Sequence, residues 1–385
     1  MPPPKFSFSL SKFPEGGLIL VIIALGILLW AFGGSVQRPK LEKGPDGAPR
    51  RVMTTNAAGD QVPAFIQVNK FLNAETLTQI AKDTSFFAIM AISMTLVIII
   101  LGIDLSVGSI YALSAVAGAM LMNHYGSNAG AGAAWQGVAL TLLVGALCGL
   151  LNGAMIVGFN VHPFIITLGT MAIYRGIAFV LTKGQSIGDF PQEFRTFMRS
   201  GVGDLSLVPL IVMVIVCVIG SIFLSRMTLG RKIYAIGGNE TASRYSGIRV
   251  RPIKLMVYVL SGLTAAISAT LALGYYGAAS SGDGQGYELN VIAAAVVGGA
   301  SLAGGKGTAL GALLGAIILQ MISAGMVILG IPQEYSQIVT GAVVIAAVLL
   351  DQLNRWLGNR RLLAKTARVK KEVVAAAETT VQAKP

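Results

Sequence analysis

The segment Phe86–Ile103, FFAIMAISMTLVIIILGI, decides the fold of this chain. It carries no charged side chain and approaches the roughly 20 apolar residues that an α-helix needs to cross a bilayer. Similar runs recur along the 385 residues, of which 54% are hydrophobic and only 12% are charged. A soluble domain carries about twice that share of charged residues. The sequence therefore predicts an all-α, polytopic membrane protein.

About ten apolar runs along the chain qualify as membrane spans. The weakest of them, Leu289–Leu302, is short enough for a half-crossing helix, which is stable only where protein or a water-filled cavity covers its backbone. The second helix is expected to start early, over Leu72–Lys82, with Asn73 as its N-cap. The first run follows a start without a signal-peptide cleavage pattern, so it is expected to be retained. The predicted spans are Gly17–Phe32, Phe86–Ile103, Ser106–Met122, Gln136–Gly158, Pro163–Leu181, Leu205–Leu224, Ile253–Leu273, Leu289–Leu302, Thr308–Leu329 and Tyr335–Leu350.

Lysine and arginine set the expected orientation, because both are enriched in cytoplasmic loops. They gather in the loop 226–254 and in the tail after Asp351. Ten spans place these regions and both termini in the cytoplasm, and put the loop 33–71 outside despite its own basic residues. The same rule explains the net charge of +12 better than nucleic-acid binding, since no basic-aromatic module accompanies the charge. The predicted regions are a cytoplasmic N-terminus (1–16), a transmembrane domain (17–351) that includes both loops, and a basic cytoplasmic tail (352–385).

An internal repeat is visible when Gly102–Leu121 is aligned with Gly299–Ile318 without a gap. Transporters are often built from such repeats. Helices rich in Gly, Ala and Leu also resemble one another through composition alone. We interpret the match as an internal repeat because turn glycines agree as well as helix residues.

The stretch Gly304–Thr308, GGKGT, is not interpreted as a nucleotide site. The pattern G-x-x-x-x-G-K-[ST] needs glycine where Ala300 stands and serine or threonine where Gly307 stands, and it follows a strand. We expect a tight turn between two spans, with Lys306 at the cytoplasmic rim. The sequence also lacks a Ser/His/Asp constellation, a metal-spaced cluster and paired catalytic carboxylates. We therefore expect no catalytic residues, no metal site and no cofactor on this chain.

Polar residues inside apolar runs are candidates for a solute pathway. The simpler role for Asp104 is structural: Asp104 or Ser106 would cap the third span and accept hydrogen bonds from free N–H groups at its start. Asn152, Asn290 and Gln320 each suit a hydrogen bond either to a hydroxylated solute or between two helices, and the second role is favoured for any one of them. The candidate pathway residues are Asn152, Phe164 and Asn290.

The stretch Thr228–Pro252, TLGRKIYAIGGNETASRYSGIRVRP, is a basic loop punctuated by glycine between two spans. It suits a docking surface for another protein better than a plain connection. A short helix over Glu240–Ser246 is expected, capped near Asn239 and ended by Gly247 in the left-handed conformation. Such a rigid helix can enter a cleft on a partner and transmit the partner's movement to the spans.

Four motifs stand in order along the chain: GIDLSVGS (102–109), PFIITLGTMAIYRGIA (163–178), YAIGGNETASRYSGI (234–248) and ELNVIAAAVVGGASLAGGKGT (288–308). Together they resemble the inner-membrane permease subunit of the ribose/galactose/xylose class of bacterial ABC importers, over about Phe71–Asp351. The resemblance implies a homodimer in the bacterial inner membrane. Each permease would dock on a cytoplasmic ATPase subunit that holds ATP and Mg²⁺, and a periplasmic binding protein would deliver the sugar.

The resemblance also implies which residues contact the ATPase. The family's coupling segment resembles G-N-x-E-A-A-x-x-S-G, and Thr241 and Ser243 stand here where that pattern has an acid and an alanine. Gly238, Asn239, Ala242, Ser246 and Gly247 match the pattern, so we still expect this segment to dock on the ATPase. The expected coupling residues are Gly230, Gly238, Asn239, Glu240, Ala242, Ser246 and Gly247.

The sequence thus predicts a permease subunit, not an enzyme, that carries a monosaccharide or related polyol inward on ATP hydrolysis by its partner. The alternative is an ion-coupled secondary transporter of a small polar solute. That class usually needs ionisable groups at mid-membrane, where Arg175 is the one candidate. An integral membrane enzyme would need a reactive constellation that the chain lacks. Pentose, hexose, inositol, a furanose signalling molecule and a nucleoside are all open as the solute, because the binding protein largely selects it in this importer class.

Overall fold

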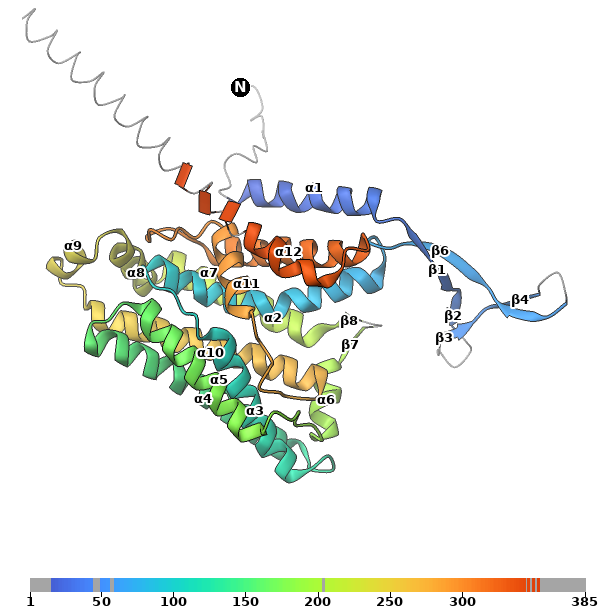
Figure 1. Cartoon of the computed structure of the whole chain (residues 1–385), viewed down its shortest axis with the longest axis horizontal. Coiled ribbons are helices and arrows are strands. Elements are labelled where there is room, and N and C mark those ends of the chain that lie inside the picture. Colours follow the sequence, from blue (N-terminus) through green and yellow to red (C-terminus); the bar gives the residue numbers. More distant parts are fainter. Residues whose placement is uncertain are drawn as a thin grey trace, which may run out of the picture.

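The chain forms a bundle of helices from which a ribbon-like arm of strands extends (Figure 1). The computed structural model describes residues 15–43, 49–55, 59–202, 205–343, 345–346, 348–349 and 352–353. Most of the predicted N-terminal region, residues 1–14, lies outside the described residues, and so does the predicted tail from residue 354 onward.

Helices occupy the predicted spans, and among the described residues six of them are long and apolar enough to cross a membrane. These six are α2, α4, α5, α7, α10 and α12, while α1 and α11 are shorter apolar helices. The prediction of an all-α membrane fold with about ten spans is therefore confirmed in outline. The helices are α1 (Gly16–Phe32), α2 (Ala74–Ile99), α3 (Val107–Tyr125), α4 (Ala131–Phe159), α5 (Pro163–Thr182), α6 (Gln192–Arg199), α7 (Leu207–Arg226), α8 (Thr228–Gly238), α9 (Glu240–Tyr245), α10 (Val250–Tyr276), α11 (Tyr287–Val297) and α12 (Ala309–Ile328).

Capping residues set several helix starts where the sequence predicted them. The side chain of Asn73 accepts a hydrogen bond from the backbone N–H of Thr76 at 2.9 Å, so α2 begins early, before its apolar run. The side chain of His162 caps α5, and Pro163 takes the first helical position, where its missing N–H costs nothing. The last predicted span, Tyr335–Leu350, is helical at its described residues from 336 onward.

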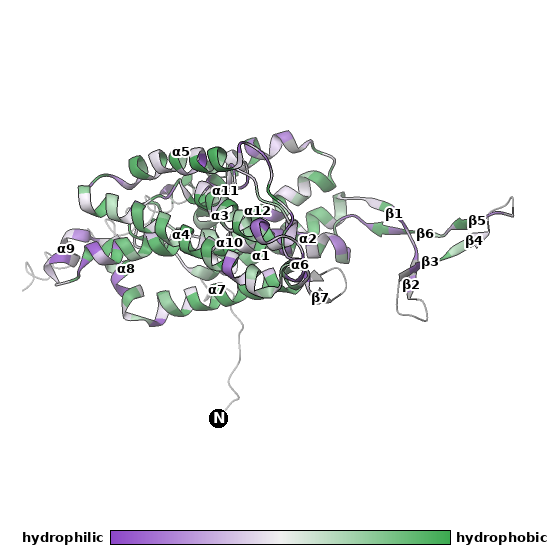
Figure 2. Ribbon diagram, turned by 90° about the horizontal axis from the view of Figure 1, so that it is seen from below, coloured by the Kyte–Doolittle hydropathy of each residue, from purple (hydrophilic) through white to green (hydrophobic). Residues whose placement is uncertain are grey.

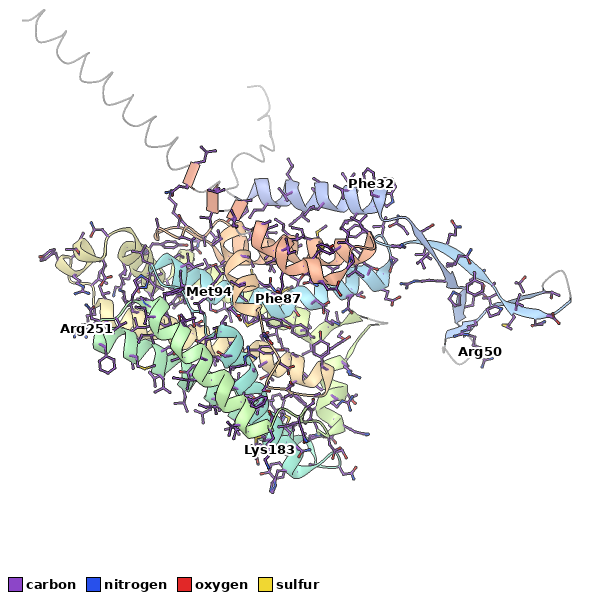
Figure 3. The ribbon with its side chains drawn as sticks, viewed as in Figure 1. Phe32, Arg50, Phe87, Met94, Lys183 and Arg251 are labelled. Carbon is purple, nitrogen blue, oxygen red and sulfur yellow. The ribbon has the colours of Figure 1, made fainter. Side chains whose placement is uncertain are left out.

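The chain runs back and forth between two opposite ends of the bundle (Figure 1). One end holds α8 and α9, and we call it the docking end; the other holds the strands before α2, and we call it the arm end. Arg251, at the start of α10, and Arg50, on the arm, mark the two ends in Figure 3. Apolar residues line the helices between them, whereas polar residues gather on α9 (Figure 2). This separation fits a membrane crossed between the two ends.

The centre of the bundle is built on α10, which packs against α4, α2 and α3. Small residues bring the backbones of α4 and α10 together, as is common between helices in lipid. A Cβ atom added to Gly149 would lie 3.0 Å from the Cα of Val259 and still closer to the carbonyl oxygen of Tyr258. On the facing helix, a Cβ atom on Gly262 would lie 2.9 Å from the backbone nitrogen of Gly149. The many glycines of the sequence thus serve close helix packing.

The weakest of the predicted spans, Leu289–Leu302, is occupied in part by α11, which has 11 residues. At 1.5 Å per residue it is about 16 Å long, roughly half of the hydrocarbon thickness. Residues 277–286 precede it without forming a helix of their own and reach into the bundle, because an added Cβ on Gly284 would lie 2.7 Å from the carbonyl oxygen of Gly108. Arg175 covers this segment by donating to the carbonyl oxygen of Ser281 at 2.7 Å and to that of Asp283 at 2.5 Å. A side chain of α5 therefore satisfies two carbonyl groups of this non-helical backbone.

The loop 33–71 folds into the arm, a feature that the sequence analysis did not anticipate. Its base is an antiparallel pair, and two further hairpins branch from it. Lys40, Val52 and Ala64 join the three branches in a ring of backbone hydrogen bonds of 2.7–2.8 Å. The strands are β1 (Ser35–Pro39), β2 (Leu41–Lys43), β3 (Pro49–Arg51), β4 (Met53–Thr55), β5 (Gln61–Pro63) and β6 (Phe65–Asn69); a separate short pair, β7 (Gly201–Val202) and β8 (Leu205–Ser206), precedes α7.

The two halves of the predicted repeat both form a helix, a turn and a second helix, but their registers differ. In the gapless alignment Ile99, the end of α2, lies opposite Val296, and α11 ends at Val297. The next helix begins at Val107 in the first copy, opposite Gly304, whereas α12 begins only at Ala309. The turn is longer in the second copy, where Gly304, Gly305 and Gly307 have positive φ. The likeness nevertheless extends through the turn into the second helix, where residues 112–119 of α3 and 309–316 of α12 share five identities.

Candidate functional site

The docking segment consists of α8, a helix that the sequence analysis did not anticipate, and α9, which forms where a short helix was predicted. The side chain of Asn239 accepts a hydrogen bond from the N–H of Ala242 at 2.9 Å and caps α9. Gly247 has φ of +81°, and the next N–H, of Ile248, bonds back to the carbonyl oxygen of Ser243 at 3.0 Å. This left-handed glycine ends the helix and satisfies its last carbonyl groups. The result is a short helix of fixed direction at the tip of the molecule.

Glu240 ties α9 to the start of α10. It accepts hydrogen bonds from Lys254 at 2.7 Å and from Arg244 at 2.6 Å. Partial burial alone would raise the pKa of Glu240, but these two cationic partners hold the pKa below its usual value of 4.5. The pair with Lys254 fixes the angle between the two helices, since the partners lie on different elements.

Acidification is expected to loosen α9. Because the pKa of Glu240 is lowered in the folded protein, its contribution to stability is complete above pH 4.5 and is lost as the pH falls through the lower, folded value. The contribution is about 1 kcal/mol or less, since both pairs are partly exposed. Hydrogen exchange of residues 238–248, corrected for the intrinsic pH dependence, measures it. Protection should fall as the pH drops from 4.5 through the lowered pKa of Glu240 in the wild type, whereas Glu240→Gln should show the reduced protection already at pH 7. Equal protection in both proteins would contradict the role of this carboxylate.

The docking segment rests directly on two turns of the bundle. Gly237 of α8 lies so close to the carbonyl oxygen of Ile99 that a Cβ atom would clash with it. The N–H of Gly305 donates to that same oxygen at 2.9 Å, and Tyr234 donates its hydroxyl to the carbonyl oxygen of Gly307 at 2.6 Å. The segment GGKGT is thus a turn, as predicted, with Lys306 exposed. Because Gly237 contacts backbone atoms of both Ile99 and Gly305, a displacement of α8 would move both turns directly.

The predicted coupling residues separate into two groups. Gly238, Asn239, Ala242, Ser246 and Gly247 are exposed, and Glu240 is half-buried against Lys254. Gly230 is buried instead: a Cβ atom there would clash with the carbonyl oxygen of Phe223. Its position makes the close turn from α7 into α8 possible. Tyr245, a large side chain that the sequence analysis did not single out, is 88% exposed in this segment.

Asn152 belongs to a buried hydrogen-bond network, one of the two roles open to it. It donates to the hydroxyl of Ser106 at 2.7 Å and accepts from the hydroxyl of Tyr174 at 3.1 Å. Ser106 in turn donates to Asp104 at 2.6 Å, and Asp104 also accepts from the hydroxyl of Ser261 at 2.7 Å. The network joins α4, α5 and α10 to the turn before α3. Asp104 accepts from the N–H of Ser106 as well, but Ser106 is the N-cap of α3 and no side chain caps this helix start, so Asp104 fixes the turn before α3 instead of capping the helix.

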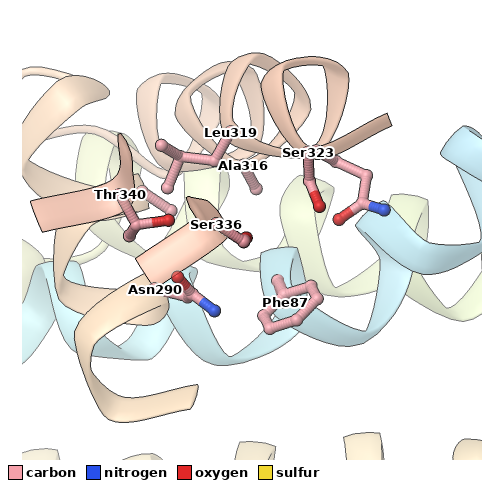
Figure 4. Close-up of a pocket in the computed structure, with 9 residues that line it drawn as sticks. Phe87, Asn290, Ala316, Leu319, Ser323, Ser336 and Thr340 are labelled. Carbon is pink, nitrogen blue, oxygen red and sulfur yellow. The ribbon is translucent and has the colours of Figure 1, made fainter. Parts of the chain in front are cut away.

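Asn290 lines a small cavity in the middle of the bundle, of about 60 Å³ (Figure 4). Phe87, Ser323, Ser336 and Thr340 surround it, and their side chains come from α2, α12 and the helical residues after 336. Gln320 lies in the same wall. The cavity thus offers hydroxyl and amide groups around one aromatic ring, which is the mixture that small-molecule sites use.

The three candidate pathway residues are not brought together. Asn290 lines the cavity of Figure 4, Asn152 lies in the buried network, and Phe164 is exposed at the start of α5. The sequence analysis missed Phe87, Ser323, Ser336 and Thr340. Their spacing held a usable signal: Gln320 and Ser323 are three residues apart and Ser336 and Thr340 four apart, so each pair shares one helix face.

Comparison with known proteins shows the family. Residues 76–348 match the family described as branched-chain amino acid transport system / permease component. The chain is 40% identical over 296 residues to the ribose import permease protein RbsC of Escherichia coli (strain K12), which covers 75% of this chain and 87% of that protein. It is 38% identical over 283 residues to the D-allose transport system permease protein AlsC of the same strain, with 74% and 85% covered. It is 35% identical over 294 residues to the autoinducer 2 import system permease protein LsrD of Klebsiella pneumoniae, with 74% and 84% covered.

These relatives match this chain over most of both lengths. The match confirms the resemblance seen in the sequence motifs and favours the importer interpretation over an ion-coupled secondary transporter. It also makes the chain a transport subunit and not a catalytic enzyme, with an ATPase and a substrate-binding protein as its functional partners. The chain therefore belongs to the family of permease components of ABC importers.

Proposed function

We propose that this permease carries a neutral monosaccharide or a related polyol into the cell, driven by ATP and Mg²⁺ bound to a separate ATPase. The observation that carries the proposal is the docking segment, a capped helix with an exposed tip seated by backbone contact on two turns of the bundle. The relatives' names favour this class of solute, because two of them import ribose and allose. Ribose, xylose and galactose are the first solutes to test.

The remaining partners and the orientation belong to the same proposal. The basic loop 226–254 and both termini lie in the cytoplasm, the arm at 33–71 lies outside, and a periplasmic binding protein delivers the sugar to the arm end of a permease in the bacterial inner membrane. A homodimer is supported by α5. Its residues Gly169 and Gly176 are exposed, and an added Cβ atom on either would meet nothing within 4 Å. Two such helices can approach each other closely in lipid.

Reconstitution in proteoliposomes tests the proposal. The chain alone, the chain with its ATPase, and the chain with ATPase and binding protein are compared, with ATP on the ATPase side. Uptake of labelled sugar is expected only in the complete system. Uptake by the chain alone on a proton or sodium gradient would contradict the proposal.

Gly247→Val is expected to reduce ATP-driven uptake about tenfold or more, while membrane insertion is unchanged. A β-branched residue at φ of +81° is strained by at least 1–2 kcal/mol, so the end of α9 would unwind or turn away from the ATPase. The control is Gly247→Asn, because asparagine tolerates the left-handed conformation; it should retain most uptake. Co-purification with the ATPase and uptake are both measured, and normal values for the valine variant would show that α9 does not dock.

A further inference from the structure

A second cavity, of about 200 Å³, lies between α3, the end of α10 and the non-helical segment before α11. Three tyrosines line it, Tyr111, Tyr276 and Tyr287, together with Asp283 and Ser186. Most of the other lining residues are alanines, whose small side chains leave the space open. We call it the tyrosine cavity. A water molecule takes about 30 Å³ of liquid, so the cavity has room for a small solute.

Two hydroxyl groups in the tyrosine cavity have no protein partner. Tyr111 is only 4% exposed, and among the described residues neither its hydroxyl nor that of Tyr287 makes a hydrogen bond. Neither oxygen is among the fully buried, unpaired side-chain atoms of the described residues. The two rings lie 5.4 Å apart between centroids, and both line the cavity. They are free to bind a polar molecule that enters the cavity.

The tyrosine cavity meets the start of α11, the half-length helix. A helix start carries partial positive charge, and transporters often turn the ends of discontinuous helices toward their solute. Tyr287, the first residue of α11, also packs against Phe87 with centroids 4.6 Å apart. Phe87 lines the other cavity, which holds Asn290, and it lies near the centre of the bundle in Figure 3. One pair of rings therefore separates two polar cavities that follow each other along α11.

The lining selects against charged solutes. No lysine, arginine or histidine lines the tyrosine cavity, and Asp283 contributes a carboxylate. Cationic side chains lie behind the lining: Arg175 donates to the carbonyl oxygens of Ser281 and Asp283, and the Nζ of Lys82 lies 5.7 Å from the ring centroid of Tyr276. At the lining itself a phosphorylated sugar would meet the carboxylate of Asp283 without a cation to pair the phosphate, which is costly in a buried site. A neutral polyol instead finds hydroxyl groups and a carboxylate to bond, and aromatic faces to cover its ring.

We propose that the tyrosine cavity binds one neutral, polyhydroxylated ring of monosaccharide size during transport, with Phe87 and Tyr287 as the barrier toward the docking end. This assignment rests on the proposed function and identifies a binding site for the solute along the transport pathway. Solute leaves the cavity when the ring pair separates and reaches the cavity that holds Asn290.

The test is ATP-driven uptake of D-ribose, D-allose and D-xylose by two variants in the complete proteoliposome system. Ala272→Leu fills the cavity, because Ala272 is a buried part of its lining, and should lower the uptake rate about tenfold. Tyr111→Phe removes one unpartnered hydroxyl and keeps the ring, so it should lower the rate about two- to tenfold, the range of one hydrogen bond. ATPase binding should stay at the wild-type level in both. D-ribose 5-phosphate should neither be imported nor compete.

The matched control is Ala139→Leu, an exposed position on α4, which should import at the wild-type rate. If Ala272→Leu fails to fold, Tyr111→Phe carries the test, since it adds no volume. Wild-type uptake rates in Tyr111→Phe and in a folded Ala272→Leu protein would overturn the assignment of the cavity and leave the proposed function standing. Import of none of the three sugars by the wild type would overturn the proposed function itself, and the solute class with it.

Discussion

Gly149→Leu is expected to prevent folding of the bundle, with little or no protein recovered in a monodisperse form from detergent. The new side chain would have to fit where even a Cβ atom meets the carbonyl oxygen of Tyr258 and lies 3.0 Å from the Cα of Val259. Both contacts are backbone atoms of α10, so no side-chain rotation relieves them. Overpacking commonly costs 1–3 kcal/mol when side chains can adjust, and here two central helices would have to separate.

The matched control for this variant lies on the same helix. A Cβ atom on Gly158 would meet nothing within 4 Å, so Gly158→Leu adds the same atoms to α4 without a clash. Size-exclusion chromatography of both variants in detergent makes the comparison, and thermal unfolding follows for any protein that is recovered. A Gly149→Leu protein as stable as Gly158→Leu would show that α4 and α10 do not pack through their glycines.

Asp104→Ala is expected to lower the free energy of unfolding by about 3 kcal/mol. Asp104 is fully buried and accepts three hydrogen bonds, from the N–H and hydroxyl of Ser106 and from the hydroxyl of Ser261, at 2.6–3.0 Å. Alanine would leave these donors without an acceptor in the interior, and each orphaned donor costs about 1–3 kcal/mol before relaxation. The effect should appear as a thermal midpoint lowered by several degrees in detergent.

The variant Asp104→Asn tests whether the hydrogen bonds of Asp104 or its charge stabilise the protein. The amide keeps the shape of the carboxylate; its oxygen can accept from Ser106 while its NH₂ group donates to Ser261, whose hydroxyl serves in either direction. We expect a loss of about 1 kcal/mol for this variant. Equal losses for the alanine and asparagine variants would mean that the charge of Asp104, and not its hydrogen bonds, stabilises the turn.

The helices and their ends were largely predictable because local chemistry determines them. Apolar runs mark the spans, while Asn73, Pro163 and Asn239 mark starts through groups that satisfy free N–H donors. Gly247 marks an end, since glycine pays little for a positive φ. The short apolar run over Leu289–Leu302 also suggested that α11 could be of half length.

The candidate site was less predictable because distant segments create it. Tyr111 and Tyr287 are far apart in sequence, and only the packing of α3 against the segment before α11 brings them together. The strands of the arm were missed for a similar reason: they are short, and their pairing depends on partners across the loop instead of an alternating pattern. Gly230 was assigned to the docking surface because a turn glycine and a contact glycine look alike in sequence.

The backbone contact between Gly237 of α8 and the carbonyl oxygen of Ile99 determines how movement is transmitted through the molecule. Side chains at an interface can rotate and absorb a small push, but peptide groups in contact cannot, so α8 and the turn after α2 must move as one rigid piece. Ile99 is also held by Gly305, which couples the two turns mechanically. A movement of the ATPase subunit would then displace the start of α3 and the start of α12 together.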